Sequence, residues 1–271
     1  MNKKTITAII LAKNEALMIA NCIETVRWCD QILVIDNGST DGTDEIAAEL
    51  GAKVVSFTSD SFAQARNKAL SFIKTDWLFY IDADERVTPN LSKEILVHME
   101  TDSADVMTLN RENFSYGQKL SYGGWQHDLL TRIFKKTALQ AWVGDIHESA
   151  KYQGKQLQLH HPLIHLTHRN TQDGLKKSSN WTKVEAKLLF EAGVGKVTLL
   201  TIFRKGMMEF LRRLVFKRGY KDGMVGWLES IIQGFNKVLI YIQVWEFQQT
   251  PTLEEKYQQK ELEIADLWKK S

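Results

Sequence analysis

The sequence has few cysteines and few prolines. Its two cysteines, Cys22 and Cys29, match neither the spacing of a zinc cluster nor that of a disulfide framework. We therefore expect two buried or half-buried free thiols in a protein of the reducing cytoplasm. Three prolines occur among 271 residues, and no serine- or glycine-rich stretch marks a flexible linker. We find no internal repeat.

Long apolar runs are also lacking. Residues 5–12 are too short a run for a signal peptide and predict a first strand. The apolar stretch 224–247 is interrupted by Glu229, Asn236 and Lys237, so we do not expect it to span a bilayer. The formal net charge is only +2 and no nucleic-acid-binding motif occurs, so we expect no nucleic-acid partner.

Strand and helix patterns alternate in the first third of the chain. The expected strands are 5–12, 31–35, 53–57 and 76–85, and the expected helices are 14–29, 43–51 and 62–74. This alternation predicts an α/β fold, with a mostly parallel sheet and helices on both faces. Short strand-like pieces follow from about 105, and the pattern is helical after 174. We place a boundary near 170, which gives a domain of residues 1–170 and a C-terminal helical region of residues 171–271.

Polar stretches follow three of the expected strands. They are "KNE" at 13–15, "DNGSTDGT" at 36–43 and "DADE" at 82–85. Ligands of parallel sheets bind beyond the carboxyl ends of the strands, so these stretches are candidate binding loops. The second stretch also fits an ordinary turn, whereas the functional reading is that Asp36 accepts hydrogen bonds from a ribose or base. No G-x-G-x-x-G follows a strand, which argues against a dinucleotide site.

The D-x-D motif in "DADE" has three possible meanings. Asp82 and Asp84 offer oxygen ligands that suit Mg²⁺ or Mn²⁺ together with diphosphate oxygens. A solvated acidic turn is the plain alternative. An aspartyl-phosphate phosphatase also runs an apolar strand into D-x-D, with the first Asp as nucleophile. That scheme uses the first strand of the sheet, whereas two strand–helix units precede the motif here, so the order disfavours a phosphatase.

Four runs in this order resemble the first half of a family 2 glycosyltransferase, an inverting enzyme with the GT-A fold. They are "IILAKNEALMIANCIETV", "ILVIDNGSTDGT", "AQARNKAL" and "WLFYIDADER", and the resemblance continues through "GGWQHDLLTRIFKK" and "GDIHES". The last run and the short chain are similar to the bacterial lipopolysaccharide-core β-glucosyltransferases of the WaaE type. The resemblance implies transfer of a hexose, glucose in that subgroup, from UDP to a lipid-linked or lipopolysaccharide-core acceptor.

The resemblance also implies roles for single residues. The nucleotide-sugar contacts would be Ala12, Glu15, Asp36, Arg66 and Asp82. Arg66 would face the diphosphate, for which a helix-borne arginine is well suited. Asp82 would lie by the ribose and the metal, and Asp84 would be the direct ligand of Mn²⁺ or Mg²⁺. Asn37 stands where many relatives have a second Asp, which leaves the base of the nucleotide open.

An inverting transfer needs a carboxylate that takes the proton of the acceptor hydroxyl. Asp128 stands where relatives place an acidic residue before a helix, and Glu148 in "GDIHES" is the second candidate. Alternatively, Asp128 caps a helix and Glu148 pairs with Arg132 or Arg169. If neither carboxylate works as a base, the chain would be a non-catalytic nucleotide-sugar-binding protein.

Five histidines gather within residues 147–168. Neither their spacing nor the absence of nearby cysteines fits a zinc site. The alternation in "HHPLIHLTH" predicts a strand with Leu163 and His165 on one face. We expect mainly structural histidines, the alternative being that one of them approaches the diphosphate or its metal.

Residues 196–221 hold eight Lys or Arg and one Glu, a local charge of +7. Helical spacing gathers apolar residues on one face, namely Leu199, Leu200, Phe203, Met207, Phe210, Leu211 and Leu214. A basic amphipathic helix commonly lies in an anionic membrane surface, and the alternative is packing on the catalytic domain. We expect a cytoplasmic protein, peripheral on the inner face of the cell membrane. The oligomeric state stays open.

Overall fold

The computed structural model describes residues 3–59, 61–144 and 149–269. The chain divides into two compact units. Unit 1 comprises residues 1–119 and 125–167, and unit 2 comprises residues 120–124 and 168–271.

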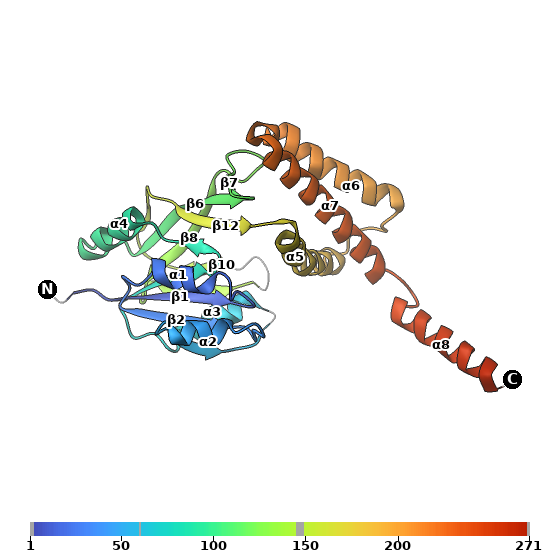
Figure 1. Ribbon diagram of the computed structural model, residues 1–271, viewed down its shortest axis with the longest axis horizontal. Coiled ribbons are helices and arrows are strands. Elements are labelled where there is room, and N and C mark those ends of the chain that lie inside the picture. The colour runs from blue at the N-terminus through green and yellow to red at the C-terminus, as the bar shows by residue number, and fades with distance from the viewer. Residues whose placement is uncertain (1–2, 60, 145–148, 270–271) are drawn as a thin grey trace. The chain divides into compact units, whose positions relative to one another are not determined.

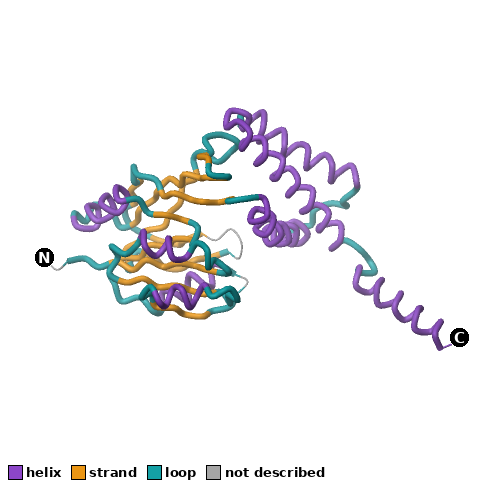
Figure 2. Tube along the Cα trace, in the orientation of Figure 1, coloured by secondary structure: helices purple, strands orange, loops and turns teal. Residues whose placement is uncertain are grey.

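Unit 1 is built on one large sheet (Figures 1 and 2). Its parallel part has the order β3-β2-β1-β4, from β1 (Ile6–Ala12), β2 (Gln31–Asp36), β3 (Lys53–Ser56) and β4 (Trp77–Asp82). Antiparallel pairing then adds β8 (Asp128–Lys135) next to β4 and β6 (Val106–Ser115) next to β8. The order ends with β12 (Leu163–His168) and β5 (Glu85–Arg86). The predicted α/β fold is confirmed, and the sheet is mixed beyond β4.

Shorter strands complete unit 1. They are β7 (Gln118–Lys119) and β11 (Gln156–Gln158), which pair with β6, and the hairpin of β9 (Leu139–Val143) and β10 (Ser149–Tyr152). The predicted strand around Leu163 and His165 is confirmed, because both residues are buried on β12.

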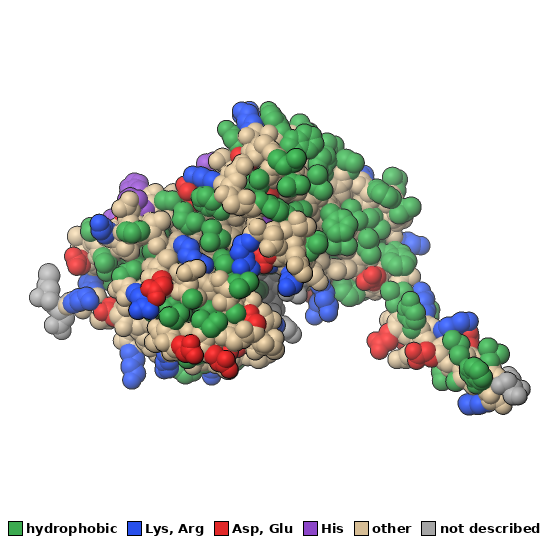
Figure 3. Space-filling model, in the orientation of Figure 1, with side chains coloured by type: hydrophobic (Ala, Val, Ile, Leu, Met, Phe, Trp, Pro, Cys, Tyr) green, Lys and Arg blue, Asp and Glu red, His purple; other side chains and the backbone are tan. Residues whose placement is uncertain are grey.

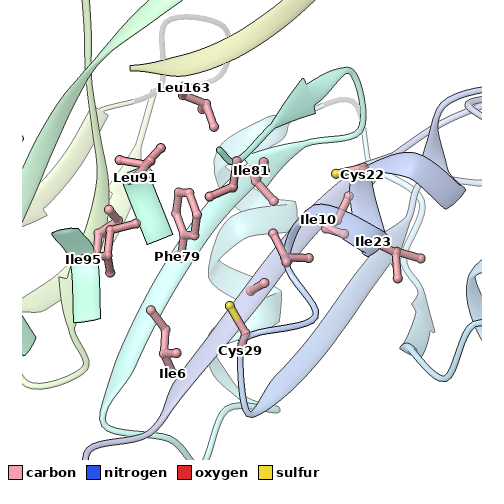
Figure 4. Close-up of a cluster of buried hydrophobic side chains, with 14 of the residues drawn as sticks. Ile6, Ile10, Cys22, Ile23, Cys29, Phe79, Ile81, Leu91, Ile95 and Leu163 are labelled. Atoms are coloured by element: carbon pink, nitrogen blue, oxygen red, sulfur yellow. The ribbon is translucent and has the colours of Figure 1, made fainter. Parts of the chain in front are cut away.

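Helices cover both faces of the sheet, as predicted. The four helices are α1 (Ile19–Thr25), α2 (Thr43–Glu49), α3 (Phe62–Leu70) and α4 (Pro89–Glu100). Ile10 of β1 faces the core that α1, α2 and α4 cover (Figure 4), and Ile9 faces the core that α3 covers. Cys22 and Cys29 are free thiols buried in the first core, as expected, and burial raises the pKa of both.

The first helix is shorter than the expected range 14–29. Residues before α1 are held by the loop after β2 instead of entering a helix. Asn14 has a left-handed backbone, with a φ of 57°, and its Oδ1 accepts from the backbone N–H of Thr40 at 2.8 Å. The backbone N–H of Glu15 donates to Oγ1 of Thr43 at 2.8 Å. These contacts bring two of the candidate binding loops together.

Unit 2 is helical, as predicted for the C-terminal region. It holds α5 (Thr171–Glu191), α6 (Leu199–Leu211), a π-helical turn (Arg212–Phe216), a 3-10 turn (Gly219–Asp222), α7 (Gly223–Phe247) and α8 (Leu253–Lys269). α6 and α7 approach closely at Gly206 and Gly234, where a Cβ on Gly234 would lie 3.0 Å from Cβ of Phe210. Among the described helices, none has the length and apolarity needed to cross a membrane.

Candidate active site

The strand ends that carry the candidate loops are neighbours in the sheet. Ala12 at the end of β1 is the ladder partner of Asp36 at the end of β2. On the other side of β1, Leu11 is the partner of Asp82 at the end of β4. The parallel register therefore brings Ala12, Asp36 and Asp82 to one edge of the sheet.

Asp36 is buried, and its carboxylate holds the loop that follows β2. Oδ2 accepts from the backbone N–H groups of Gly38 and Ser39, each at 3.1 Å. The side chain of Asn37 is engaged with Ser59, since its Nδ2 donates to the Ser59 carbonyl at 2.9 Å and its Oδ1 accepts from the Ser59 N–H at 2.8 Å. These bonds shape the loop, and the roles of Ala12, Glu15 and Asp36 as nucleoside contacts stay predictions.

Asp82 lies between two arginines. Its Oδ2 is 2.9 Å from Nη2 of Arg132 and its Oδ1 is 3.3 Å from Nη2 of Arg66. Burial alone would raise the pKa of Asp82, but the guanidinium groups of Arg132 and Arg66 outweigh it and hold the pKa at about 2. Arg66 is almost fully buried, with its guanidinium carbon 4.7 Å from the centre of the Trp142 ring. Guanidinium groups held in place in this way suit the binding of an anion such as a diphosphate.

Asp84 faces a histidine from β12. Ladder pairing of Glu85 with His165 sets the two strands side by side, and Nε2 of His165 lies 3.3 Å from Oδ2 of Asp84. The other ring nitrogen, Nδ1, is 2.6 Å from Oδ1 of Asn113. Among the histidines considered from the sequence, His165 is therefore the one that lies beside Asp84, and an approach of this histidine to a diphosphate or its metal stays a prediction.

Asp84 and His165 fit a divalent cation in donor chemistry and in spacing. Their 3.3 Å separation is close to the roughly 3.0 Å between neighbouring ligands of an octahedral cation that binds at about 2.1 Å. In the described part of the chain, no group of three His, Cys, Asp or Glu side chains is arranged to hold a metal. A cation bound here would take these two side chains as part of its shell, and diphosphate oxygens and water would complete it.

Glu85 and Arg111 connect the D-x-D motif to the candidate base. Glu85 is fully buried; its Oε2 accepts from the backbone N–H of Asp82 at 2.8 Å, and its Oε1 lies 3.1 Å from Nη1 of Arg111. Burial raises the pKa of Glu85, and the charge of Asp82 adds to this. Nε of Arg111 donates to Oδ2 of Asp128 at 2.8 Å. Sequence reasoning missed both connecting residues.

Asp128 begins strand β8 rather than a helix, so the expected position before a helix and the helix-cap alternative are both wrong. Cross-strand pairing with Arg111 of β6 draws the segment into the sheet. Two donors converge on Oδ2 of Asp128, namely Nε of Arg111 at 2.8 Å and Nδ2 of Asn113 at 3.2 Å. Among the described residues, no donor contacts Oδ1, which leaves this oxygen for a substrate proton.

Glu148, the second candidate base, lies outside the described residues. The two arginines considered as its partners have other carboxylates beside them. Arg132 donates to Asp82 at 2.9 Å, and Arg169 donates to Asp173 at 3.0 Å. The choice between Asp128 and Glu148 as the base stays a prediction.

Comparison with known proteins identifies the family. Residues 7–170 match the model of glycosyl transferase family 2. The chain belongs to this family. This family 2 glycosyltransferase is 26% identical over 255 residues to an uncharacterized glycosyltransferase of Rickettsia prowazekii, covering 87% of this chain and 85% of that one. It is 22% identical over 251 residues to the lipopolysaccharide core biosynthesis glycosyltransferase LpsC of Rhizobium meliloti, covering 84% and 87%.

Solved structures also resemble the glycosyltransferase. Glucosyl-3-phosphoglycerate synthase of Mycobacterium tuberculosis, crystallised with Mn²⁺, UDP-glucose and phosphoglyceric acid, is 23% identical with a TM-score of 0.36. The match covers 41% of this chain and 44% of that chain, so this chain spans less than half of that protein's length.

Proposed function

We propose that this family 2 glycosyltransferase transfers a hexose, with glucose as the first candidate, from UDP to a lipid-linked or lipopolysaccharide-core acceptor with inversion. One observation carries the proposal. One chain of polar contacts in unit 1 joins seven residues of the candidate site. In order of contact they are Asp84, His165, Asn113, Asp128, Arg111, Glu85 and Asp82. A candidate metal ligand, a candidate base and an arginine-bound carboxylate are therefore held in one rigid arrangement.

The chemistry follows from the side chains. Asp128 takes the proton of the acceptor hydroxyl while the oxygen of that hydroxyl attacks the anomeric carbon. The bond from that carbon to the diphosphate oxygen breaks, and UDP leaves with the bonding electrons. Arg66 and Arg132 offset the charge of the departing diphosphate. When bound at Asp84 and His165, Mn²⁺ or Mg²⁺ supplies further Lewis-acid stabilisation of that charge.

The acceptor class rests on a relative and on the surface of unit 2. LpsC of Rhizobium meliloti is named for lipopolysaccharide core biosynthesis, which supports an acceptor anchored in lipid. An enzyme with such an acceptor has to work at a membrane surface.

Unit 2 has a broad exposed apolar surface on α6 and α7, visible as the green side chains over these helices in Figure 3. Its exposed members are Leu199, Leu200, Phe203, Met207, Leu211, Met224, Trp227, Ile231 and Phe235. The apolar residues of α6 and those of α7 adjoin, since the ring centres of Phe210 on α6 and Trp227 on α7 are 6.4 Å apart. Soluble monomers rarely expose so continuous an apolar surface, which supports insertion into a lipid headgroup layer.

Cations accompany this apolar surface. Arg204, Arg218 and Lys221 are exposed on or next to it. Arg212 and Arg213 are held by Glu209 at 2.6 and 2.7 Å, so their charge is partly compensated. Exposed cations beside apolar side chains suit an anionic bilayer, such as the inner face of a cell membrane.

The test of the proposed function is a donor assay with the full chain. UDP-glucose is incubated with Mn²⁺, with and without extracted lipopolysaccharide core, and UDP release and sugar transfer are followed. Metal-dependent UDP release that the acceptor accelerates supports the proposal. A protein that binds UDP-glucose and leaves it intact under both conditions would be a nucleotide-sugar binder.

A further inference from the structure

Asn113 is a fully buried polar residue between the candidate metal ligand and the candidate base. Oδ1 lies 2.6 Å from Nδ1 of His165, and Nδ2 lies 3.2 Å from Oδ2 of Asp128. Nδ2 also lies 3.2 Å from the backbone oxygen of Trp125. A single amide therefore contacts both halves of the site.

The chemistry of these neighbours determines which way the amide points. The Asp128 carboxylate and the Trp125 carbonyl can only accept hydrogen bonds, so the NH₂ group of Asn113 must face them. The amide oxygen then faces His165 and can only accept, so Nδ1 of His165 carries the hydrogen. In the neutral ring, this leaves the lone pair on Nε2, which faces Asp84.

The same NH₂ group restricts the candidate base. Together with Nε of Arg111, it binds Oδ2 of Asp128 and fixes the rotation of that carboxylate. This leaves Oδ1 of Asp128 as the oxygen that takes the proton of the acceptor hydroxyl.

We propose that Asn113 is a positioning residue that sets both the ring orientation of His165 for metal binding and the orientation of the Asp128 carboxylate for proton transfer. This inference rests on the proposed function and extends it to a residue that contacts both His165 and the candidate base.

Two substitutions at this position separate the two roles. Asn113→Leu has nearly the same shape and removes both contacts. Asn113→Asp keeps an oxygen that accepts from Nδ1 of His165, but it replaces the donor to Asp128 with a second negative charge. The first change should affect metal binding and turnover, and the second mainly turnover.

The experiment measures UDP binding by calorimetry with and without Mn²⁺, and turnover by Mn²⁺-dependent hydrolysis of UDP-glucose. Asn113→Leu should weaken Mn²⁺-dependent UDP binding about 10- to 100-fold, as expected when a partner of a ligating histidine is lost. Asn113→Asp should bind UDP in Mn²⁺ almost as the unmodified chain does, with kcat lowered about 10²-fold or more, because general-base catalysis contributes about 10²- to 10⁴-fold.

Asn110→Leu is the matched control, since it makes the same change on the same strand at a side chain with no hydrogen bond among the described residues. Failure of the unmodified chain to bind UDP with Mn²⁺ would overturn the proposed function itself. If it binds, and Asn113→Asp loses binding and turnover equally or loses neither, only the positioning role is overturned. The measurements on Asn113→Asp test the positioning role even if the Asn113→Leu variant does not fold.

Discussion

Nη2 of Arg132 lies 2.9 Å from Oδ2 of Asp82, and the two residues come from neighbouring antiparallel strands. Arg66 reaches the other carboxylate oxygen from helix α3 at 3.3 Å. Asp82 therefore serves as the anchor that holds two buried guanidinium groups at the end of β4. A diphosphate that arrives at this strand end meets preorganised positive charge, which costs little rearrangement.

Replacing Arg132 should make the stability of the fold less dependent on acidic pH. The pKa of Asp82 is about 2 in the folded chain and about 3.9 in an unfolded chain. Because the folded value is the lower one, ionised Asp82 stabilises the fold above about pH 4, and this contribution is lost as the pH falls toward 2. Arg132→Met removes a favourable charge, so the pKa of Asp82 rises. The gap between the folded and the unfolded pKa then narrows, so urea unfolding at a series of pH values should show lower stability at neutral pH and a smaller loss of stability between about pH 4 and pH 2 than in the unmodified chain.

Arg27→Met is the control for this experiment, because Arg27 is exposed and its ion-pair partner among the described residues is Glu24 of α1. The pKa of Glu85 is raised, so its effect on stability has the opposite sign. Because Arg132 lowers the pKa of Glu85 as well, Arg132→Met raises the pKa of both carboxyl groups, and both changes reduce the stability lost in acid. Identical pH dependence in Arg132→Met and Arg27→Met would show that the Arg132–Asp82 pair does not set the pKa of Asp82.

Asp84→Asn should abolish Mn²⁺-dependent binding of UDP while the fold is kept. The amide loses the charge that a hard cation requires, although its shape is almost unchanged. UDP affinity is measured by calorimetry with and without Mn²⁺, and folding by thermal melting. Asp266→Asn on α8, an exposed aspartate paired with Lys269, is the control. UDP affinity in Mn²⁺ equal to that of the control would rule out Asp84 as a ligand.

Asp128→Asn should leave binding of UDP-glucose close to normal and lower turnover about 10²- to 10⁴-fold, the usual contribution of a general base. The amide can still accept from Arg111, so the network survives while the proton acceptor is lost. Turnover and KM are compared with those of Glu148→Gln. If Glu148→Gln gives the large loss in kcat and Asp128→Asn does not, the two roles must be exchanged.

The strand ends could be predicted from sequence because their signal is local. Apolar β-rich runs stop at Ala12, Asp36 and Asp82, and parallel strands bring such ends together. The alternation around His165 likewise predicted the strand that carries Leu163 and His165 on one face.

The contacts that join these positions have no local signal. Arg111 and Asn113 meet Asp128 and His165 only through the pairing of β6 with β8 and the position of β12 in the sheet. The register between distant strands decides such contacts, and a single sequence does not encode it in any short motif. The same pairing explains why Asp128 starts a strand where a helix was expected.

Charge reversal on unit 2 should release the protein from anionic membranes. Arg204 and Arg218 are exposed, and neither forms an ion pair with a described residue, so each can face lipid headgroups. Each Lys or Arg near an anionic surface contributes about 1 kcal/mol. Reversing both to Glu should therefore reduce co-sedimentation with phosphatidylserine-containing vesicles at low salt, while hydrolysis of soluble UDP-glucose persists. Arg212 and Arg213 are less suitable for this test, because both bind Glu209.

Lys176→Glu with Lys183→Glu is the matched control, since it makes the same change in charge on exposed positions of another helix of unit 2, α5. Trp227→Ser tests the apolar part separately and should weaken vesicle binding at high salt as well, because insertion of an apolar side chain is not screened by salt. If the unmodified protein stays in the supernatant at low salt, it does not bind these vesicles. The apolar surface of α6 and α7 would then be a contact surface for another protein chain. Equal loss in the α5 control would instead mean that only total charge matters, and that α6 and α7 form no specific membrane-binding face.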